Sequence, residues 1–276
     1  MEASLPAAPS VPATGFLGRH QFVIYRLFSM AGIFPIGAYF VVHLLTNLTV
    51  LDPQMFQESV DRIHSLRIFL WVVEWTFIFL PIAFHAVVGL IIISGGMPNT
   101  GSYPLSGNIR YTLQRATGMI ALVFIVWHVI HLHYLFGGPF KSIGGAQFDD
   151  QHATSSAAGA IQAALWIQIC YAIGVVACAY HFANGIWTAG ITWGVWMSAA
   201  AQSRASKVCL AIGLALAAVG LGALFGMDRV DVPKVRAVED RAIEAGEFEQ
   251  GKITLPELKT QESAPPADLP SAESKK

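Results

Sequence analysis

The sequence predicts an all-α membrane protein built as a bundle of five transmembrane helices. Three features indicate this fold class. Hydrophobic residues make up 54% of the 276 residues and charged residues only 13%, whereas a soluble domain carries about 25% charged residues. Five apolar stretches reach the roughly 20 residues that cross a bilayer core. The densest run of charges comes after residue 227, outside these stretches.

The five predicted spans are separated by turn-forming sequence. Several of them exceed the minimum length, so we expect tilt or extension beyond the membrane. The connections hold turn formers such as Asp52-Pro53 and Gly144-Gly145. The approximate limits of the spans are 22–50, 66–95, 111–136, 159–190 and 207–227.

The chain divides into three parts on this basis. Residues 1–20 form an N-terminal segment, 21–227 the membrane domain, and 228–276 a tail with eight Lys/Arg and eleven Asp/Glu residues. We expect the tail to lie outside the membrane, with a helix near 238–248 and disorder after 264. A net charge of −1 gives no reason to expect nucleic acid as a partner.

The distribution of basic residues predicts the orientation. With the N-terminus in the cytoplasm, the inner loops are basic and the outer loops carry more acidic than basic residues, which fits the positive-inside rule. Five spans then place the C-terminus outside. The basic residues of the tail count against this orientation. The inner basic residues are Arg19, Arg26, Arg110, Arg115, Arg204 and Lys207.

One histidine lies well inside each of the first four spans, and the third span holds two more, His131 and His133, nearer its end. Ionisable side chains within a membrane are costly and usually face the bundle interior. At a rise of about 1.5 Å per residue, His43 and His128 lie about 30 and 24 Å outward along their spans. His85 and His181 lie about 25 and 33 Å inward along theirs. The four histidines therefore form an outer and an inner pair.

Two facing imidazoles can bind one haem iron, so this arrangement predicts two stacked haems inside the bundle. A structural zinc site would instead gather four ligands together. His131 lies one turn beyond His128 on nearly the same face and is an alternative outer ligand, whereas His133 is off that face. The remaining His20, His64 and His152 suit solvated or structural roles.

Glu74 is the only carboxylate inside a predicted span. It precedes His85 by eleven residues, a rotation of about 1100° and so nearly three whole turns, which places it on the ligand's face. A buried carboxylate can exchange protons near neutrality. The alternative is an ion pair with Arg67. Glu58, in the preceding loop, is either a second proton carrier or a solvated residue.

The residues around the histidines resemble the two-haem cytochrome b subunit of succinate:menaquinone reductases. The resemblance covers about residues 20–227 in order. It rests on Arg26-Leu27-Phe28-Ser29, Gly32, Pro35, Gly37 and His43-Leu44-Leu45-Thr46-Asn47 in the first span, and on Phe77-Ile78-Phe79-Leu80-Pro81 and His85-Ala86-Val87-Val88-Gly89 in the second. It continues in Leu113-Gln114-Arg115-Ala116-Thr117-Gly118, Trp127-His128 and His181-Phe182-Ala183-Asn184-Gly185-Ile186-Trp187.

This resemblance implies two non-covalent haem b groups. It implies that His85 and His181 bind the inner haem iron, and that His43 and His128, rather than His131, bind the outer one. Ser29 and Arg115 resemble residues near the inner haem propionates, although Arg115 also suits a positive-inside anchor. Some fumarate reductases of this type carry a proton-transferring Glu where this chain has Ala179.

The resemblance also implies a function in the bacterial cytoplasmic membrane. The chain would carry electrons between an iron–sulfur subunit and menaquinone, beside a flavoprotein subunit that interconverts succinate and fumarate. Its own sequence has neither a flavin-binding glycine fingerprint nor cluster cysteines. Two alternatives are the cytochrome b subunit of a hydrogenase or formate dehydrogenase, and a non-redox membrane protein that relays protons.

Overall fold

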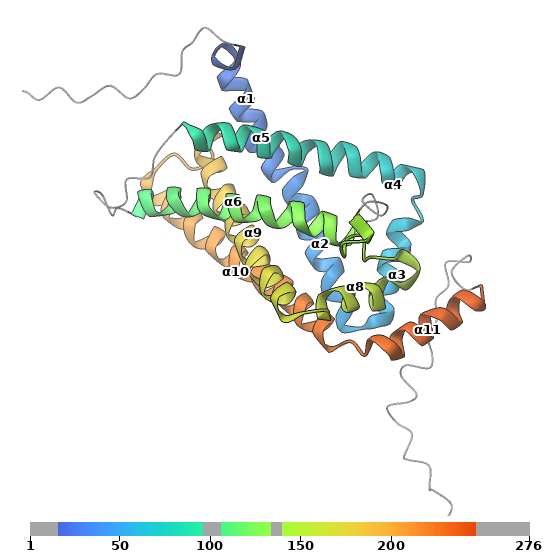
Figure 1. Ribbon diagram of the computed structural model, residues 1–276. Coiled ribbons are helices and arrows are strands. Elements are labelled where there is room, and N and C mark those ends of the chain that lie inside the picture. The colour runs from blue at the N-terminus through green and yellow to red at the C-terminus, as the bar shows by residue number, and fades with distance from the viewer. Residues whose placement is uncertain (1–15, 96–105, 134–139, 247–276) are drawn as a thin grey trace, which may run out of the picture.

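The structure is a computed structural model that describes residues 16–95, 106–133 and 140–246 (Figure 1). Within these ranges all regular structure is helical, without strands. Five helical stretches are long and apolar enough to cross a membrane, which confirms the predicted fold class. They are Gly18–Leu51, Ile68–Ser94, Gly107–Leu132, Leu165–Thr192 and Ala199–Arg229.

The first two spans are composite. Helices α1 (Phe16–Ile33) and α2 (Ile36–Leu48) meet at Pro35, whose ring nitrogen cannot donate a helical hydrogen bond. The second span joins α4 (Ile68–Val73) to α5 (Leu80–Ser94) through a π-helical stretch, Glu74–Phe79. π-Helical stretches are rare overall, but those that occur often lie at functional sites.

The other three spans are single helices: α6 (Ser106–Leu132), α9 (Leu165–Thr192) and α10 (Ala199–Arg229). The fourth span starts six residues later than predicted because the preceding segment folds as a separate helix, α8 (Ala153–Gln162). The fifth starts earlier, since Ser198 caps α10 by accepting from the Ala201 amide at 3.2 Å.

Small residues let the long helices approach one another closely. A Cβ added at Gly220 of α10 would lie 2.5 Å from Val175 of α9 and 3.2 Å from Leu44 of α2. Such close approach is the usual basis of helix packing in membranes. Helix α9 thereby packs between α10 and α6, while α5 packs along α1 (Figure 1).

The bundle has two different ends. At one end α1 begins, α5 ends, α6 begins and α9 ends; we call it the N-terminal end. The other end carries three short helices, α3 (Pro53–His64), α8 and α11 (Val232–Glu244), and we call it the capped end (Figure 1). Helix α11 belongs to the predicted tail and packs against α8. Its bounds differ from the expected 238–248.

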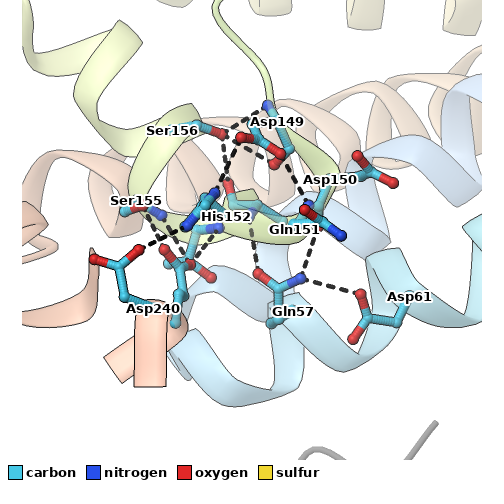
Figure 2. A network of polar contacts seen from close by, with 12 residues as sticks. Gln57, Asp61, Asp149, Asp150, Gln151, His152, Ser155, Ser156 and Asp240 are labelled. Carbon is cyan, nitrogen blue, oxygen red and sulfur yellow. Dashed lines mark hydrogen bonds and ion pairs between the residues drawn. The ribbon is translucent and has the colours of Figure 1, made fainter. Parts of the chain in front are cut away.

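Two fully buried side chains join the helices of the capped end (Figure 2). Glu239 of α11 is 1% exposed and accepts from the backbone amides of Thr154 and Ser155 at 3.1 and 3.2 Å, and from the Ser155 hydroxyl. Gln57 of α3 accepts from the Ala153 amide at 2.8 Å and donates to the Asp150 carbonyl at 2.8 Å. These bonds satisfy the amides at the N-terminus of α8 that have no partner within the helix.

A histidine extends this polar network across the same surface. His152 lies between two carboxylates, with Nδ1 at 3.0 Å from Asp149 and Nε2 at 2.9 Å from Asp240 (Figure 2). Burial raises the pKa of the Asp149 carboxyl, but the hydrogen bonds from His152 and the Gln151 amide outweigh it and the net pKa is lowered. Burial raises the pKa of Glu239 despite its hydrogen bonds from Ser155.

Several expectations fall outside the described residues. They concern most of the segment 1–20, most of the loop 96–110 and the tail beyond residue 246.

Candidate functional site

The structure brings the four span histidines together as two pairs. The ring centres of His85 on α5 and His181 on α9 are 6.2 Å apart; we call this the first pair. The ring centres of His43 on α2 and His128 on α6 are 5.8 Å apart; this second pair lies nearer the capped end. Two metal–imidazole bonds of about 2 Å each would separate facing ring centres by about 6 Å. Within each pair, the two rings are therefore spaced to bind one metal ion between them.

The first pair is held in one tautomer by backbone carbonyls. His85 Nδ1 lies 3.1 Å from the carbonyl oxygen of Phe28, and His181 Nδ1 lies 3.1 Å from that of Gln114. A carbonyl can only accept, so each Nδ1 donates and each Nε2 keeps a free lone pair. Metal-binding histidines almost always have such a partner on the other ring nitrogen.

Two glycines make room for the rings of the first pair. A Cβ at Gly32 would lie 2.8 Å from the His85 ring, and a Cβ at Gly118 would lie 2.8 Å from the His181 ring. The Phe28 ring stacks on His85 at 4.2 Å. These side chains fix the orientation of both imidazoles, so the donor set and its surroundings fit a haem with two histidine ligands.

The helices that carry the histidines are paired rather than evenly packed. Helix α5 packs on α1, and α6 packs on α9, whereas close backbone contacts of α5 with α6 or α9 are few among the described residues. This separation would leave room for a haem between the helices that would supply its histidine ligands. A structural zinc site would gather four ligands together. Among the described residues, no three or more His, Cys, Asp or Glu side chains come together to hold a metal ion.

The second pair has tyrosine neighbours instead of carbonyls. His128 Nδ1 lies 3.2 Å from the Tyr171 hydroxyl, and His43 Nδ1 lies 3.4 Å from the Tyr39 hydroxyl. The Asn47 amide donates to the His43 carbonyl at 2.8 Å and lies 3.4 Å from its Nε2. A metal on His43 Nε2 would replace this longer contact.

His131, the alternative outer ligand, occupies a different position. Its ring stacks on Trp127 at 5.1 Å, and its Nδ1 lies 3.0 Å from the Tyr171 hydroxyl. Among the histidines, His128 is the one whose ring contacts the ring of His43. His131 is thus a neighbour of the second pair and does not face His43.

The two predicted propionate residues lie toward the N-terminal end. Arg115 of α6 donates to the Tyr111 hydroxyl and to the carbonyl of Ile93 in the last turn of α5. This bonding joins α6 to α5 and satisfies a helix-terminal carbonyl. Ser29 follows Phe28 on α1 and is partly buried. Haem contact by either residue stays a prediction.

Glu74 lies at the start of the π-helical stretch, near the capped end. Its carboxylate is 3.6 Å from Nε2 of His133, and its side chain is 13% exposed. The carboxylate therefore contacts an imidazole, His133, whereas the partner that the sequence suggested was Arg67. Glu58 lies on α3, where it accepts from Gln54 at 2.9 Å.

Sequence reasoning missed a polar network beside the first pair. Arg110 donates to Asn184 at 3.0 Å, Asn184 donates to the Gln114 side chain at 2.7 Å, and Gln114 donates to the His181 carbonyl at 3.2 Å. Asn184 is 4% exposed. Its spacing of three residues from His181, which places both on one helix face, is the signal that could have found it.

Fold and site together define a class: a multi-pass membrane protein with two pairs of facing imidazoles inside a helical bundle. No protein-family profile matches the chain. The chain is similar to the succinate dehydrogenase cytochrome b558 subunit of Bacillus subtilis (strain 168), with 31% identity over 209 residues, which cover 75% of this chain and 98% of that protein. The chain belongs to the family of cytochrome b subunits of succinate dehydrogenase, and as such is one subunit of a larger complex.

Proposed function

We propose that the chain carries electrons between an iron–sulfur subunit and menaquinone in a succinate:menaquinone oxidoreductase or fumarate reductase. The observation that carries this proposal is the presence of two histidine pairs, one beyond the other along the bundle, with ring centres 6.2 and 5.8 Å apart. Two such pairs make two one-electron sites along the bundle. The family supplies the reaction context, because the Bacillus relative is a succinate dehydrogenase subunit by name.

Each pair has a distinct role in this proposal. His85 and His181 bind the iron of the inner haem, and His43 and His128 bind the iron of the outer haem. Haem b, when bound, supplies a one-electron couple at each iron. The chain itself orients the imidazoles through the Phe28 and Gln114 carbonyls and excludes water with an apolar bundle. Arg115 and Ser29 assist at the inner haem propionates.

Quinone reduction also needs protons near the outer haem. Glu74 and His133 lie at the same end of the bundle as the second pair, 3.6 Å apart. A carboxylate and an imidazole in contact can pass a proton between them and to a quinone oxygen. In this proposal Glu58, on α3, serves as a second proton carrier on the side of the capped end.

The proposed orientation places the N-terminus in the cytoplasm and the C-terminus outside. The N-terminal end of the bundle carries Arg26, Arg110, Arg115 and Arg204, and the flavoprotein and iron–sulfur subunits dock on this side. The inner haem then lies on the side of the iron–sulfur subunit.

Two other functions are weaker. A hydrogenase or formate dehydrogenase cytochrome would share the histidine pairs, but similarity to a succinate dehydrogenase subunit over 98% of that protein favours the succinate complex. A non-redox proton relay would not need imidazoles paired at a spacing that suits a shared metal ion.

The test is purification of the complex from membranes by a tag on this chain. We expect a flavoprotein and an iron–sulfur protein to co-purify, and succinate to reduce part of the bound haem. A preparation that holds haem but is reduced only by hydrogen or formate would support the alternative cytochrome. A preparation without haem would contradict both.

A further inference from the structure

The hydroxyl of Tyr171 lies between two imidazoles of another helix. Tyr171 belongs to α9, and its oxygen is 3.2 Å from Nδ1 of His128 and 3.0 Å from Nδ1 of His131, both on α6. The tyrosine is 7% exposed and His131 is 8% exposed. These three groups therefore satisfy one another in a region with little water.

Proton counting restricts the direction of the two hydrogen bonds. A phenol has one proton to donate and can accept others, and a neutral imidazole carries a proton on one nitrogen only. Tyr171 can therefore donate to only one of the two histidines, and because its buried hydroxyl has no other partner among the described residues, it donates to one and accepts from the other. If His128 offers Nε2 to a metal, its proton is on Nδ1, so His128 donates to Tyr171. The tyrosine proton then goes to Nδ1 of His131.

We propose that Tyr171 is a positioning residue for the outer haem ligand, in a directed chain from His128 through Tyr171 to His131. This inference rests on the proposed function, because it needs His128 to bind iron. It also gives His131 a role: not a ligand, but the acceptor that turns the tyrosine oxygen toward His128. Stacking on Trp127 at 5.1 Å holds His131 in that place.

The two pairs differ in the hydrogen-bond partners of their Nδ1 atoms, and only the partners of the second pair are side chains that a substitution can change. The first pair donates to backbone carbonyls, which no substitution removes. The second pair meets tyrosine hydroxyls. A hydrogen-bond acceptor on Nδ1 raises the basicity of Nε2, and this favours the oxidised, more highly charged iron. Loss of the Tyr171 hydroxyl should therefore raise the midpoint potential of the outer haem and leave the inner haem unchanged.

The experiment is a redox titration of the purified complex, followed by haem absorbance, in the wild type and in Tyr171→Phe. We expect two haem components in both proteins, with one shifted to higher potential in the variant. Tyr180→Phe is the control, because this tyrosine lies on the same helix and bonds no histidine among the described residues. His131→Leu keeps a similar volume but removes the acceptor, and should give a smaller upward shift of the same component with both haems retained.

The outcomes separate this inference from the proposed function. Two components in the wild type that both stay in place in Tyr171→Phe would overturn the role of Tyr171 alone. Absence of two components in the wild type would overturn the proposed function and this inference with it. If Tyr171→Phe loses the outer haem, His131→Leu decides: an upward shift supports the chain, and an unchanged potential or a lost haem contradicts it.

Discussion

At the residue scale, the His181 ring of the first pair has room only because Gly118 has no side chain. An alanine there would place a Cβ 2.8 Å from the His181 ring, so the imidazole must move. Gly118→Ala should therefore reduce the occupancy of one haem and leave the other in place, as measured by haem content and redox titration. Gly107→Ala, on the same helix with nothing within 4 Å of its added Cβ, is the matched control. Equal haem content in the two variants would contradict this packing.

Glu74 tests the proton route at the same scale. Glu74→Gln keeps the shape of the side chain but removes the exchangeable carboxyl proton. General acid–base groups contribute about 10²–10⁴-fold to rate, so quinone-linked turnover should fall within that range while both haems stay bound. Succinate oxidation with an artificial acceptor is the control, and it should be unchanged. Near-normal quinone kinetics in a fully assembled variant would remove Glu74 from the mechanism.

The sequence alone could single out a residue where one position carried its own signal. His43, His85, His128 and His181 were visible because an ionisable group in an apolar span is costly. Tyr171 and His133 were not, because a tyrosine and a helix-end histidine have ordinary structural roles. Their importance comes from contacts with residues that are 40 or more positions away in the chain.

Buried Glu239 controls the packing of α11 on α8 at the scale of the elements. Glu239→Ala would leave two buried amides of α8 without acceptors, at a cost of about 1–3 kcal/mol each. Trypsin should then cleave α11 faster, at Lys234, Arg236 or Arg241. Glu244→Ala, an exposed change on the same helix, is the control. Unchanged proteolysis in Glu239→Ala would show that α11 is held by other contacts.

The same carboxyl predicts a pH dependence. Because burial raises the pKa of Glu239 above its unfolded value of 4.5, its contribution to stability is complete below about 4.5 and is lost as the pH rises through the folded-state pKa. The pKa of Asp149 is lowered, so its contribution is lost only below its unfolded value of 3.8. From about pH 4.5 up to neutral pH, the protease resistance of α11 should therefore fall as the pH rises. Glu239→Gln should weaken this trend.

Element boundaries were harder to predict than element existence. Hydrophobicity found all five spans, but the end of α8, from residue 159 on, was included in the fourth span because its Gly, Ala and Ile residues are apolar. The π-helical stretch changes the rotation between Glu74 and His85 from that of a uniform α-helix, and no sequence pattern announced it. The position of α11 depends on burial of Glu239 against α8, a tertiary contact.

At the scale of the whole molecule, the difference between the two ends of the bundle predicts where the iron–sulfur subunit docks. The capped end is covered by α3, α8 and α11, whereas the first pair lies toward the N-terminal end. Cross-links from the iron–sulfur subunit should therefore fall within the N-terminal segment, 96–110 or 191–206. Mass spectrometry of the cross-linked complex measures this. Cross-links concentrated in 51–65 or 137–158 would contradict both the docking and the orientation.

The number of haem groups per chain tests the central claim most directly. Two histidine pairs, each spaced to hold one iron between its rings, predict two haem b groups, and these are non-covalent because the chain has no Cys-x-x-Cys-His attachment motif. Pyridine haemochrome analysis of the purified complex, divided by protein content, should give two haems per chain. His85→Ala, His181→Ala, His43→Ala and His128→Ala should each retain one. One haem or none in the wild type, or two haems in His128→Ala, would contradict the account.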